Sequence, residues 1–322
     1  MKYFIFFYFH VYEILRILSV YHIKRVIKLV FIHKEGKFND NSFLIDGFLF
    51  GASRSLALYV VENEGTRMLI DTSTADQAKG IIKKLKMYQI YPIQKILLTH
   101  AHWDHTAGVN ELKALMPEVD IEVLASENAI DNLKEPAAMN DVFEATVEPI
   151  EEVTPLKEGD IIDLNGLKLE VFNFFGHTMD SIALFDEKNR NIFTGDAIMN
   201  KSGYTYVQPT FMPPEFNESE LLKTFQKLRD MKGKLSSITL AHFGVWTDAD
   251  FETILDEMEE FHFKTKNAII QWYNKNLSSR EIALKYFKTF IPNSKMVEYG
   301  LLDNLEMNIK WLIEGLRLSG FI

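Results

Sequence analysis

The sequence predicts an α/β fold in which two β-sheets pack face to face and helices cover their outer sides. Residues 55–125 alternate strand-like runs with helical ones, and residues 160–194 hold a second group of short strand-like runs. Turn residues such as Gly-Asp and Asn-Gly separate the runs of the second group. Two strand-rich halves with helices between them are typical of packed sheets, because each apolar face must be buried against another element.

The elements of the first half follow from apolar runs and from helical spacing. A turn at residues 63–65 joins the first two strands. Apolar residues at every third or fourth position indicate the helices. The expected strands are residues 55–62, 67–70, 95–99 and 121–125, and the expected helices are residues 75–88 and 107–116.

The second half begins with short strands that turns connect. Its last helix places apolar residues on one side, as expected of a helix that packs on a sheet. The expected strands are residues 160–164, 168–173, 181–186, 191–194 and 236–241, and the expected helix is residues 216–231.

Length and composition limit the classes of function. The 322 residues suffice for one large domain and an accessory piece. We expect an apolar extension over residues 1–40, the main domain over residues 41–248 and a helical region over residues 249–322. The formal charge of −10 argues against a surface that coats nucleic-acid phosphates, and it favours a small or neutral substrate.

The absence of cysteine restricts the chemistry of any metal site. Without cysteine the chain forms neither disulfides nor thiolate zinc sites, so a metal must be held by nitrogen and oxygen ligands. This composition fits an intracellular protein, and we expect a cytoplasmic location.

The first forty residues differ from the rest of the chain. Their longest uninterrupted apolar run is about ten residues, whereas a membrane span needs about twenty, so a spanning helix is not expected. Three interpretations stay open: an amphipathic helix on a membrane surface, an added docking helix, or translated upstream sequence that the mature protein lacks. We favour the last of these and expect no membrane partner.

The last seventy residues predict three helices. Residues 249–276 form the first, Ser278 and Glu281 have the spacing of a capping box for the second, and residues 304–318 form the third. Residues 250–322 carry 9 Lys plus Arg and 11 Asp plus Glu, a net charge of −2, which is unlike a nucleic-acid-binding module. We expect this helical region either to pack against the main domain or to form an oligomer such as a homodimer.

The stretch Thr99-His100-Ala101-His102-Trp103-Asp104-His105 gathers four metal-ligand types directly after an apolar strand. His100 and His102 are two residues apart, so an extended backbone points both imidazoles the same way. Imidazole and carboxylate together suit zinc, and also iron or manganese. A chance cluster is improbable, because the whole chain has only 9 histidines.

Further ligands are expected where other strands end. His177 lies in Gly-His-Thr, Asp196 follows Gly195, and His242 lies in Ala-His-Phe-Gly. Taken singly, a histidine at a strand end is more often a hydrogen-bonded structural residue. Together with the first cluster these side chains give a ligand count suited to two ions.

The ordered set THAHWDH, GHT, GD and AHFG resembles the metallo-β-lactamase superfamily over Ser55 to about Trp246. The resemblance implies a four-layer αββα sandwich with the site along one edge of both sheets. It implies that Asp196 bridges the ions and that Asp71 steadies the ligand loop from behind. The implied ligands are His100, His102 and His177 for the first ion and Asp104, His105 and His242 for the second.

Departures from the family pattern limit the branches of the superfamily that the chain can resemble. The common β-lactamases carry Cys where Asp196 stands, and the flavin-linked diiron enzymes carry Glu where His102 stands, so both are excluded. The chain resembles the second glyoxalase enzyme in THAHWDH but lacks its His-Glu-Tyr-Thr after the last ligand strand. The lactonases place Tyr where Met199 stands, although Tyr204 and Tyr206 are close enough in sequence to reach inward.

Two further features have open interpretations. Asp180 stands where the family more often has Gly, and it either alters the preferred substrate charge or caps a strand. The C-terminal helices resemble the small winged-helix-like tails of some hydrolases of this superfamily, of which some are RNA endonucleases.

Two loops are expected to border the site. Residues 127–155 are acidic and contain three prolines, so they predict a helix followed by a long loop. Residues 199–214 are rich in Tyr, Phe, Met and Pro and directly follow the Asp196 region. The second loop is either an ordinary packed loop or an aromatic substrate wall, and a wall would suit an apolar or acyl group.

The expected function is dinuclear metal-dependent hydrolysis of a small acyl substrate, either a thioester, a lactone or an ester. Two cations, most simply zinc, would share a hydroxide, because metal coordination lowers the pKa of water to about 7. Asp104 is the expected catalytic side chain, orienting the nucleophile or passing a proton to the leaving group. The alternatives are a metal-dependent nuclease and a single-iron enzyme like the persulfide dioxygenases.

Overall fold

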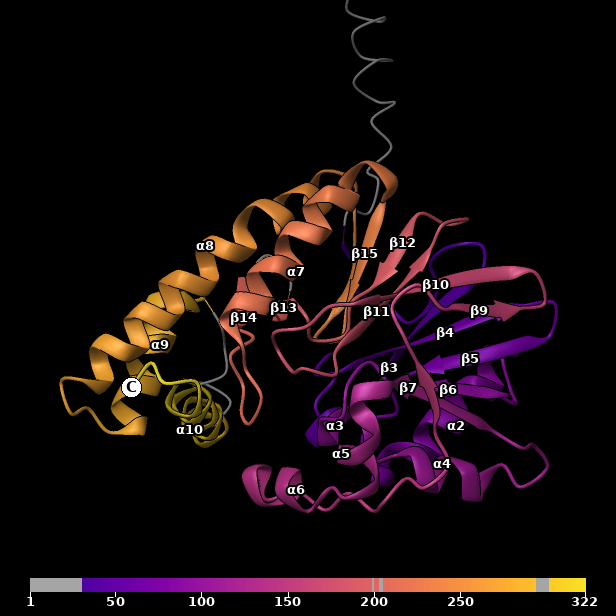
Figure 1. Ribbon diagram of the computed structural model, residues 1–322, viewed down its shortest axis with the longest axis horizontal. Coiled ribbons are helices and arrows are strands. Elements are labelled where there is room, and N and C mark those ends of the chain that lie inside the picture. The colour runs from indigo at the N-terminus through magenta and orange to yellow at the C-terminus, as the bar shows by residue number, and fades with distance from the viewer. Residues whose placement is uncertain (1–30, 199, 203–204, 294–300) are drawn as a thin grey trace, which may run out of the picture. The chain divides into compact units, whose positions relative to one another are not determined.

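The computed structural model describes residues 31–198, 200–202, 205–293 and 301–322 (Figure 1). The expected N-terminal extension lies outside the described residues as far as residue 30. Two seven-stranded sheets form the centre of the described region. None of the described helices combines the length and the apolar character that crossing a membrane requires.

The N-terminal sheet has the strand order β2-β3-β4-β5-β6-β7-β8. Its last four strands pair in parallel, so β5, β6 and β7 direct their carboxyl ends to one edge. The bounds are β2 Gly36–Lys37, β3 Ser42–Asp46, β4 Ala57–Asn63, β5 Thr66–Ile70, β6 Lys95–Leu97, β7 Glu122–Ser126 and β8 Thr154–Leu156. The helices within this half are α2 Ala78–Met87, α3 Trp103–Thr106, α4 Val109–Leu115, α5 Ile130–Lys134 and α6 Ala137–Phe143.

The C-terminal sheet has the strand order β1-β16-β15-β12-β11-β10-β9. Within it β12 and β15 are parallel neighbours, which brings their carboxyl ends together. The bounds are β1 Phe31–Ile32, β9 Ile161–Leu164, β10 Leu167–Asn173, β11 Ile182–Asp186, β12 Asn191–Phe193, β15 Ser237–Leu240 and β16 Gly244–Thr247. A separate hairpin joins β13 Asn200–Ser202 to β14 Thr205–Gln208.

Alternating side chains along the strands divide the interior into three cores. On β4, Tyr59 and Val61 belong to the core between the sheets, whereas Leu58 and Val60 pack toward α2 and α4. On the second sheet, Phe185 of β11 packs into the third core, beneath α7 and α8. Figure 1 shows the helices on the outer sides of the two sheets. The predicted four-layer αββα sandwich is therefore confirmed.

The main domain begins earlier than the expected boundary at residue 41. Phe31 pairs with Trp246 across β1 and β16, and their rings stack with centroids 4.2 Å apart. The two-residue strand β2 pairs with β3. Strands of two residues are too short to show an alternation of apolar and polar side chains. For this reason the sequence analysis placed them in the N-terminal extension.

Four long helices lie in the last third of the described chain. The first three are α7 Glu218–Met231, α8 Asp248–Tyr273 and, after a turn, α9 Ser279–Phe290. Ser278 and Glu281 form the predicted capping box at the start of α9. The last helix, α10 Leu302–Leu318, packs against α9 and shares the core beneath the C-terminal sheet.

Candidate metal centre

The seven predicted ligands come together from four strand ends. The cluster from His100 to His105 follows β6, and α3 begins within it. His177 follows β10, Asp196 follows β12, and His242 follows β15. The donor atoms approach within 4.8 Å of one another in three groups, which are His100 with His102 and His177, His100 with His105 and Asp196, and Asp104 with His105 and His242.

His102 and His177 face each other through nitrogen atoms that carry no proton. His102 Nε2 lies 3.2 Å from the Pro213 carbonyl, and His177 Nδ1 lies 2.7 Å from the Thr210 carbonyl. Each of these nitrogens must donate, because a carbonyl only accepts. The opposite nitrogens, His102 Nδ1 and His177 Nε2, are 3.0 Å apart. Two facing lone pairs fit a cation that both nitrogens coordinate.

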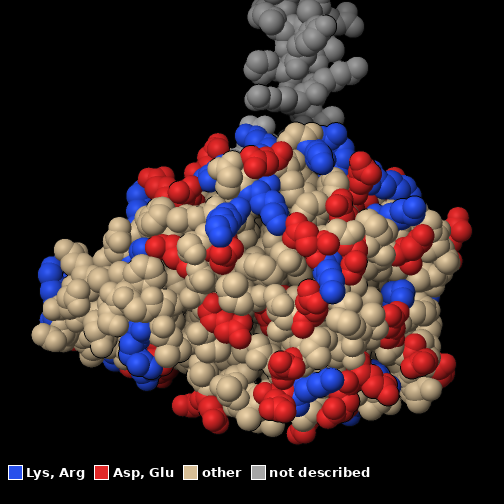
Figure 2. Space-filling model, viewed as in Figure 1, with Lys and Arg blue, Asp and Glu red and all other residues tan. Residues whose placement is uncertain are grey.

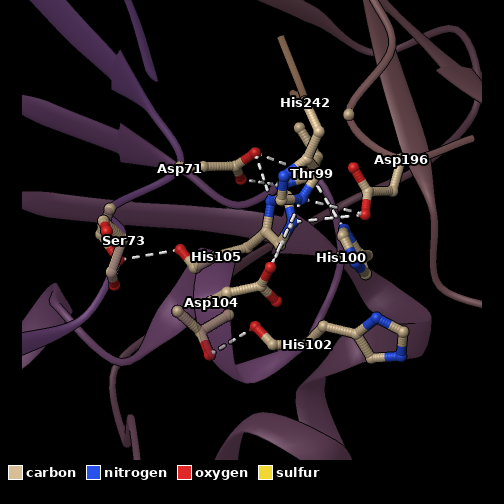
Figure 3. Close-up of polar contacts among 12 residues, drawn as sticks. Asp71, Ser73, Thr99, His100, His102, Asp104, His105, Asp196 and His242 are labelled. Carbon is tan, nitrogen blue, oxygen red and sulfur yellow. Dashed lines mark hydrogen bonds and ion pairs between the residues drawn. The ribbon is translucent and has the colours of Figure 1, made fainter. Parts of the chain in front are cut away.

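His100 and His105 are oriented from behind by a shared acid. Asp71 accepts from His105 Nδ1 at 2.8 Å and from the Thr99 hydroxyl at 2.9 Å. That hydroxyl lies 3.1 Å from His100 Nδ1 and accepts its proton. The inward nitrogen of each ring, Nε2, is buried without a hydrogen-bond partner among the described residues. In Figure 3, Asp71 lies on one side of His105 and Asp196 lies on the other.

His242 completes the cluster opposite the two carboxylates. Its Nδ1 donates to the Ser55 carbonyl, which leaves Nε2 directed inward. Nε2 lies 3.4 Å from the Asp104 carboxylate and 3.5 Å from the Asp196 carboxylate. The second oxygen of Asp196 is buried without a partner in the described chain. Nitrogen and oxygen atoms without partners, gathered in these groups, are the kind of donors that bind zinc, iron or manganese.

Without metal, the histidines of the cluster form two groups whose pKa values shift in opposite directions. Burial lowers the pKa of His102 to about 3, and burial with the neighbouring His105 holds the pKa of His100 well below its ordinary value. Burial opposes charge on His242 as well, but the Asp196 and Asp104 carboxylates raise its pKa to about 10. The first half thus presents neutral imidazoles that are ready to coordinate, whereas protons occupy the second half.

A glycine lets the two sheets approach each other at the site. Gly195 has φ +53°, and a Cβ atom there would lie 2.6 Å from the Thr99 hydroxyl oxygen. Only glycine fits this conformation and this distance, so Asp196 can lie beside the histidine cluster.

Asp180 joins two ligand loops and does not line the pocket described below. Its carboxylate accepts from the Ala101 backbone N–H at 3.2 Å and from the Thr178 hydroxyl. Ala101 lies between two of the ligands, and Thr178 adjoins a third. Burial raises the pKa of Asp180 to about 6. Asp180 was expected either to alter the preferred substrate charge or to cap a strand. These contacts fit a structural role, because the side chain is 1% exposed.

A cavity of about 250 Å³ opens beside the cluster. Both loops that were expected to border the site line this cavity: residues 127–155 through Phe143, and residues 199–214 through Gln208 and Met212. Tyr204 lies outside the described residues. The helix α10, expected only to pack or to form oligomers, supplies a further wall. The lining residues are Leu49, Phe50, Ala52, Ser55, His102, Trp103, Asp104, Phe143, His177, Asp196, Gln208, Met212, His242, Leu301, Asn304, Met307, Asn308 and Trp311.

The family model of the metallo-beta-lactamase superfamily matches residues 57–239. An uncharacterized protein of Bacillus subtilis strain 168, YobT, is 29% identical over 188 residues, which are 53% of this chain and 77% of that protein. A hydroxyacylglutathione hydrolase of Francisella tularensis subsp. holarctica is 26% identical over 142 residues, 44% of this chain. The chain spans about half the length of that hydrolase, 47%.

Solved structures are similar in fold. A metallo-beta-lactamase family protein of Thermus thermophilus, TTHA1429, gives a TM-score of 0.61 at 19% sequence identity. The likeness covers 87% of this chain and 94% of that protein.

Proposed function

The chain belongs to the metallo-beta-lactamase superfamily of metal-dependent hydrolases, and from this premise we propose that it holds two metal ions and hydrolyses a small acyl substrate. One observation carries the proposal. Each of five imidazoles has one nitrogen bonded to an outer acceptor while its other nitrogen points into the cluster, toward the other ligands. Such outer partners fix the tautomer that a metal ligand needs.

Two ions share the ligands in this proposal. His100, His102 and His177 would hold the first, Asp104, His105 and His242 would hold the second, and Asp196, which lies near ligands of both groups, would be shared. Zinc is the preferred metal and iron or manganese the alternatives, because all ligands are nitrogen or oxygen. When bound, the ions lower the pKa of water to about 7 and polarise the acyl carbonyl.

Asp104 is the proposed catalytic side chain. It lies in the first turn of α3 and lines the pocket, where its carboxylate is the only described one besides Asp196. From that position it can orient the attacking water through a hydrogen bond and then return a proton to the leaving oxygen or sulfur. Burial opposes ionisation of Asp104, but the neighbouring His105 and His242 lower its pKa and so favour the ionised carboxylate that this role needs.

The residues that line the pocket favour an acyl substrate rather than a polynucleotide. Aromatic and other apolar side chains provide half of its lining residues, and no Lys or Arg among the described residues contributes to it. Backbone phosphates need such cations for binding. On the face seen in Figure 2, basic side chains are interspersed with acidic ones. Thioesters, lactones and esters are therefore the proposed class, and a cytoplasmic location and a homodimer stay predictions.

The test combines metal analysis with a substrate panel. Purified protein is analysed for metals and assayed on thioesters, lactones and phosphodiesters, alongside His102→Ala, Asp104→Asn and the exposed control Asp131→Asn. We expect hydrolysis of an acyl substrate, about a hundredfold loss or more in Asp104→Asn, and no loss in the control. Cleavage of phosphodiesters alone, or one iron per chain, would contradict the proposal.

A further inference from the structure

The helix α10 has two faces with different surroundings. Leu305, Ile309 and Leu312 are buried in the core that α10 shares with the C-terminal sheet. The other face directs Asn304, Met307, Asn308 and Trp311 to the pocket. The pocket-facing residues recur at three- and four-residue spacing, so one stripe of the helix lies along the substrate space.

Aromatic contacts connect this stripe to the metal ligands. The Trp311 ring packs edge-on against Phe143 with centroids 5.2 Å apart, and Phe143 packs against His102 at 5.0 Å. Across the opening, Phe50 is 60% exposed and lies 5.4 Å from the Trp103 ring. A substrate group that extends from the ligand cluster toward α10 would therefore pass between aromatic and aliphatic walls.

The polar groups on this stripe are amides. The side-chain N–H of Asn308 donates to the backbone carbonyl of Asn304 at 3.0 Å. The side-chain oxygen of Asn308 is therefore oriented and available to accept. No described residue hydrogen-bonds to the side-chain amide of Asn304, which offers one donor group and one acceptor. Amides satisfy a hydroxyl or another amide well, but they do not compensate for the desolvation of a carboxylate.

We infer that α10 selects substrates whose part remote from the reacting carbonyl is uncharged. That part combines an apolar body, held between Phe50 and Trp311, with a hydroxyl or amide that Asn304 and Asn308 bind. The inference rests on the proposed hydrolysis and specifies its substrate class. A thioester whose thiol ends in a carboxylate is then a poor substrate, because no cation among the described lining residues pairs with it.

The test uses a matched pair of butyryl thioesters. One has N-acetylcysteamine as its thiol, and the other carries a carboxylate on the acetyl group. We expect kcat/KM for the neutral thioester to be about tenfold higher or more, since a buried unpaired charge costs more than an unpaired neutral group. Equal values, or a preference for the carboxylate form, would overturn the inference while leaving the hydrolase proposal intact.

Variants on α10 assign the preference to its residues. Asn304→Leu should raise KM for the neutral thioester severalfold with little change in kcat or metal content, and Asn304→Gln should restore part of the affinity. Asn304→Lys should shift the preference toward the carboxylate form. Lys310→Leu, an exposed position on the same helix, is the matched control. If Asn304→Leu and Asn304→Lys leave the ratio of the two kcat/KM values unchanged, α10 does not select the substrate. A metal-loaded chain that hydrolyses no thioester, lactone or ester overturns both proposals.

Discussion

The buried carboxylate of Asp71 orders the ligand loop through three hydrogen bonds. It accepts from the Thr99 N–H at 2.8 Å, from the Thr99 hydroxyl at 2.9 Å and from His105 Nδ1 at 2.8 Å. The resemblance implied that Asp71 steadies this loop, and these contacts agree with it. The backbone acceptors Ser55, Thr210 and Pro213 were not foreseen, because a carbonyl that orients a histidine leaves no mark in a side-chain pattern.

Asp71→Asn tests the role of this carboxylate. The amide keeps the shape of the side chain but replaces one acceptor oxygen with a donor, so His105 loses its orienting partner. We expect the affinity for the more weakly held ion to fall about 10- to 100-fold. Competition with a chelating dye measures it, with Asp131→Asn as control, and equal affinities for variant and wild type would refute the role.

Asp180 makes stability depend on pH. Burial raises its pKa from 3.8 in the unfolded chain to about 6 in the folded one. The folded state thus binds this proton more tightly, and the free energy of unfolding falls as the pH rises from 4 toward 6 and beyond. From the shift, the full effect is about 3 kcal/mol above that range.

Asp180→Asn should remove this dependence, because the amide is neutral at every pH and can still accept from Ala101. Urea unfolding of the metal-free proteins at pH 5 and pH 8 gives the comparison. The variant should gain stability relative to wild type at pH 8. A difference that is the same at both pH values would show that Asp180 does not titrate as described.

At the scale of elements, the strands that carry ligands were predictable and their short neighbours were not. The strand β6 leads through Leu98 and β10 alternates apolar and polar residues, and a histidine follows each within a few residues, so the strand pattern and the ligand chemistry coincide there. In contrast, β1, β2 and β16 have two to four residues, too few to show a period, and β1 is defined by pairing with β16 far away in sequence. The pocket face of α10 was missed because only its apolar core face was used to predict the helix, although the spacing of Asn304, Asn308 and Trp311 was visible.

Gly315 fixes α10 against the segment that orients two ligands. A Cβ atom at this position would lie 2.4 Å from the Phe211 carbonyl oxygen. The neighbouring carbonyls of Thr210 and Pro213 hold His177 and His102. A shift of α10 is therefore transmitted both to the pocket wall and to the first metal site.

Gly315→Ala should lower stability by about 1–3 kcal/mol, because the packed backbone must move, and should raise KM. Gly80→Ala in α2 is the matched control, since its Cβ would meet nothing within 4 Å. That control should stabilise the protein by up to about 1 kcal/mol through helix propensity. Thermal unfolding and steady-state kinetics measure both variants, and similar behaviour of the two would contradict the close contact at Gly315.

At the scale of the molecule, the ligands come from both sheets. The cluster from His100 to His105 belongs to the N-terminal sheet, whereas His177, Asp196 and His242 follow strands of the C-terminal sheet. Bound ions would crosslink the two halves of the sandwich and stabilise the fold. The order of the sequence motifs predicted this convergence, but not the start of the domain before residue 41.

The number of zinc ions that the full chain binds after chelation tests the central claim most directly. Calorimetric titration at pH 7 should give two zinc ions per chain. It should also give release of about two protons, because His105 and His242 are protonated without metal and must lose their protons to coordinate. His102→Ala should retain one site. A wild-type chain that binds a single ion, or none, would contradict the account.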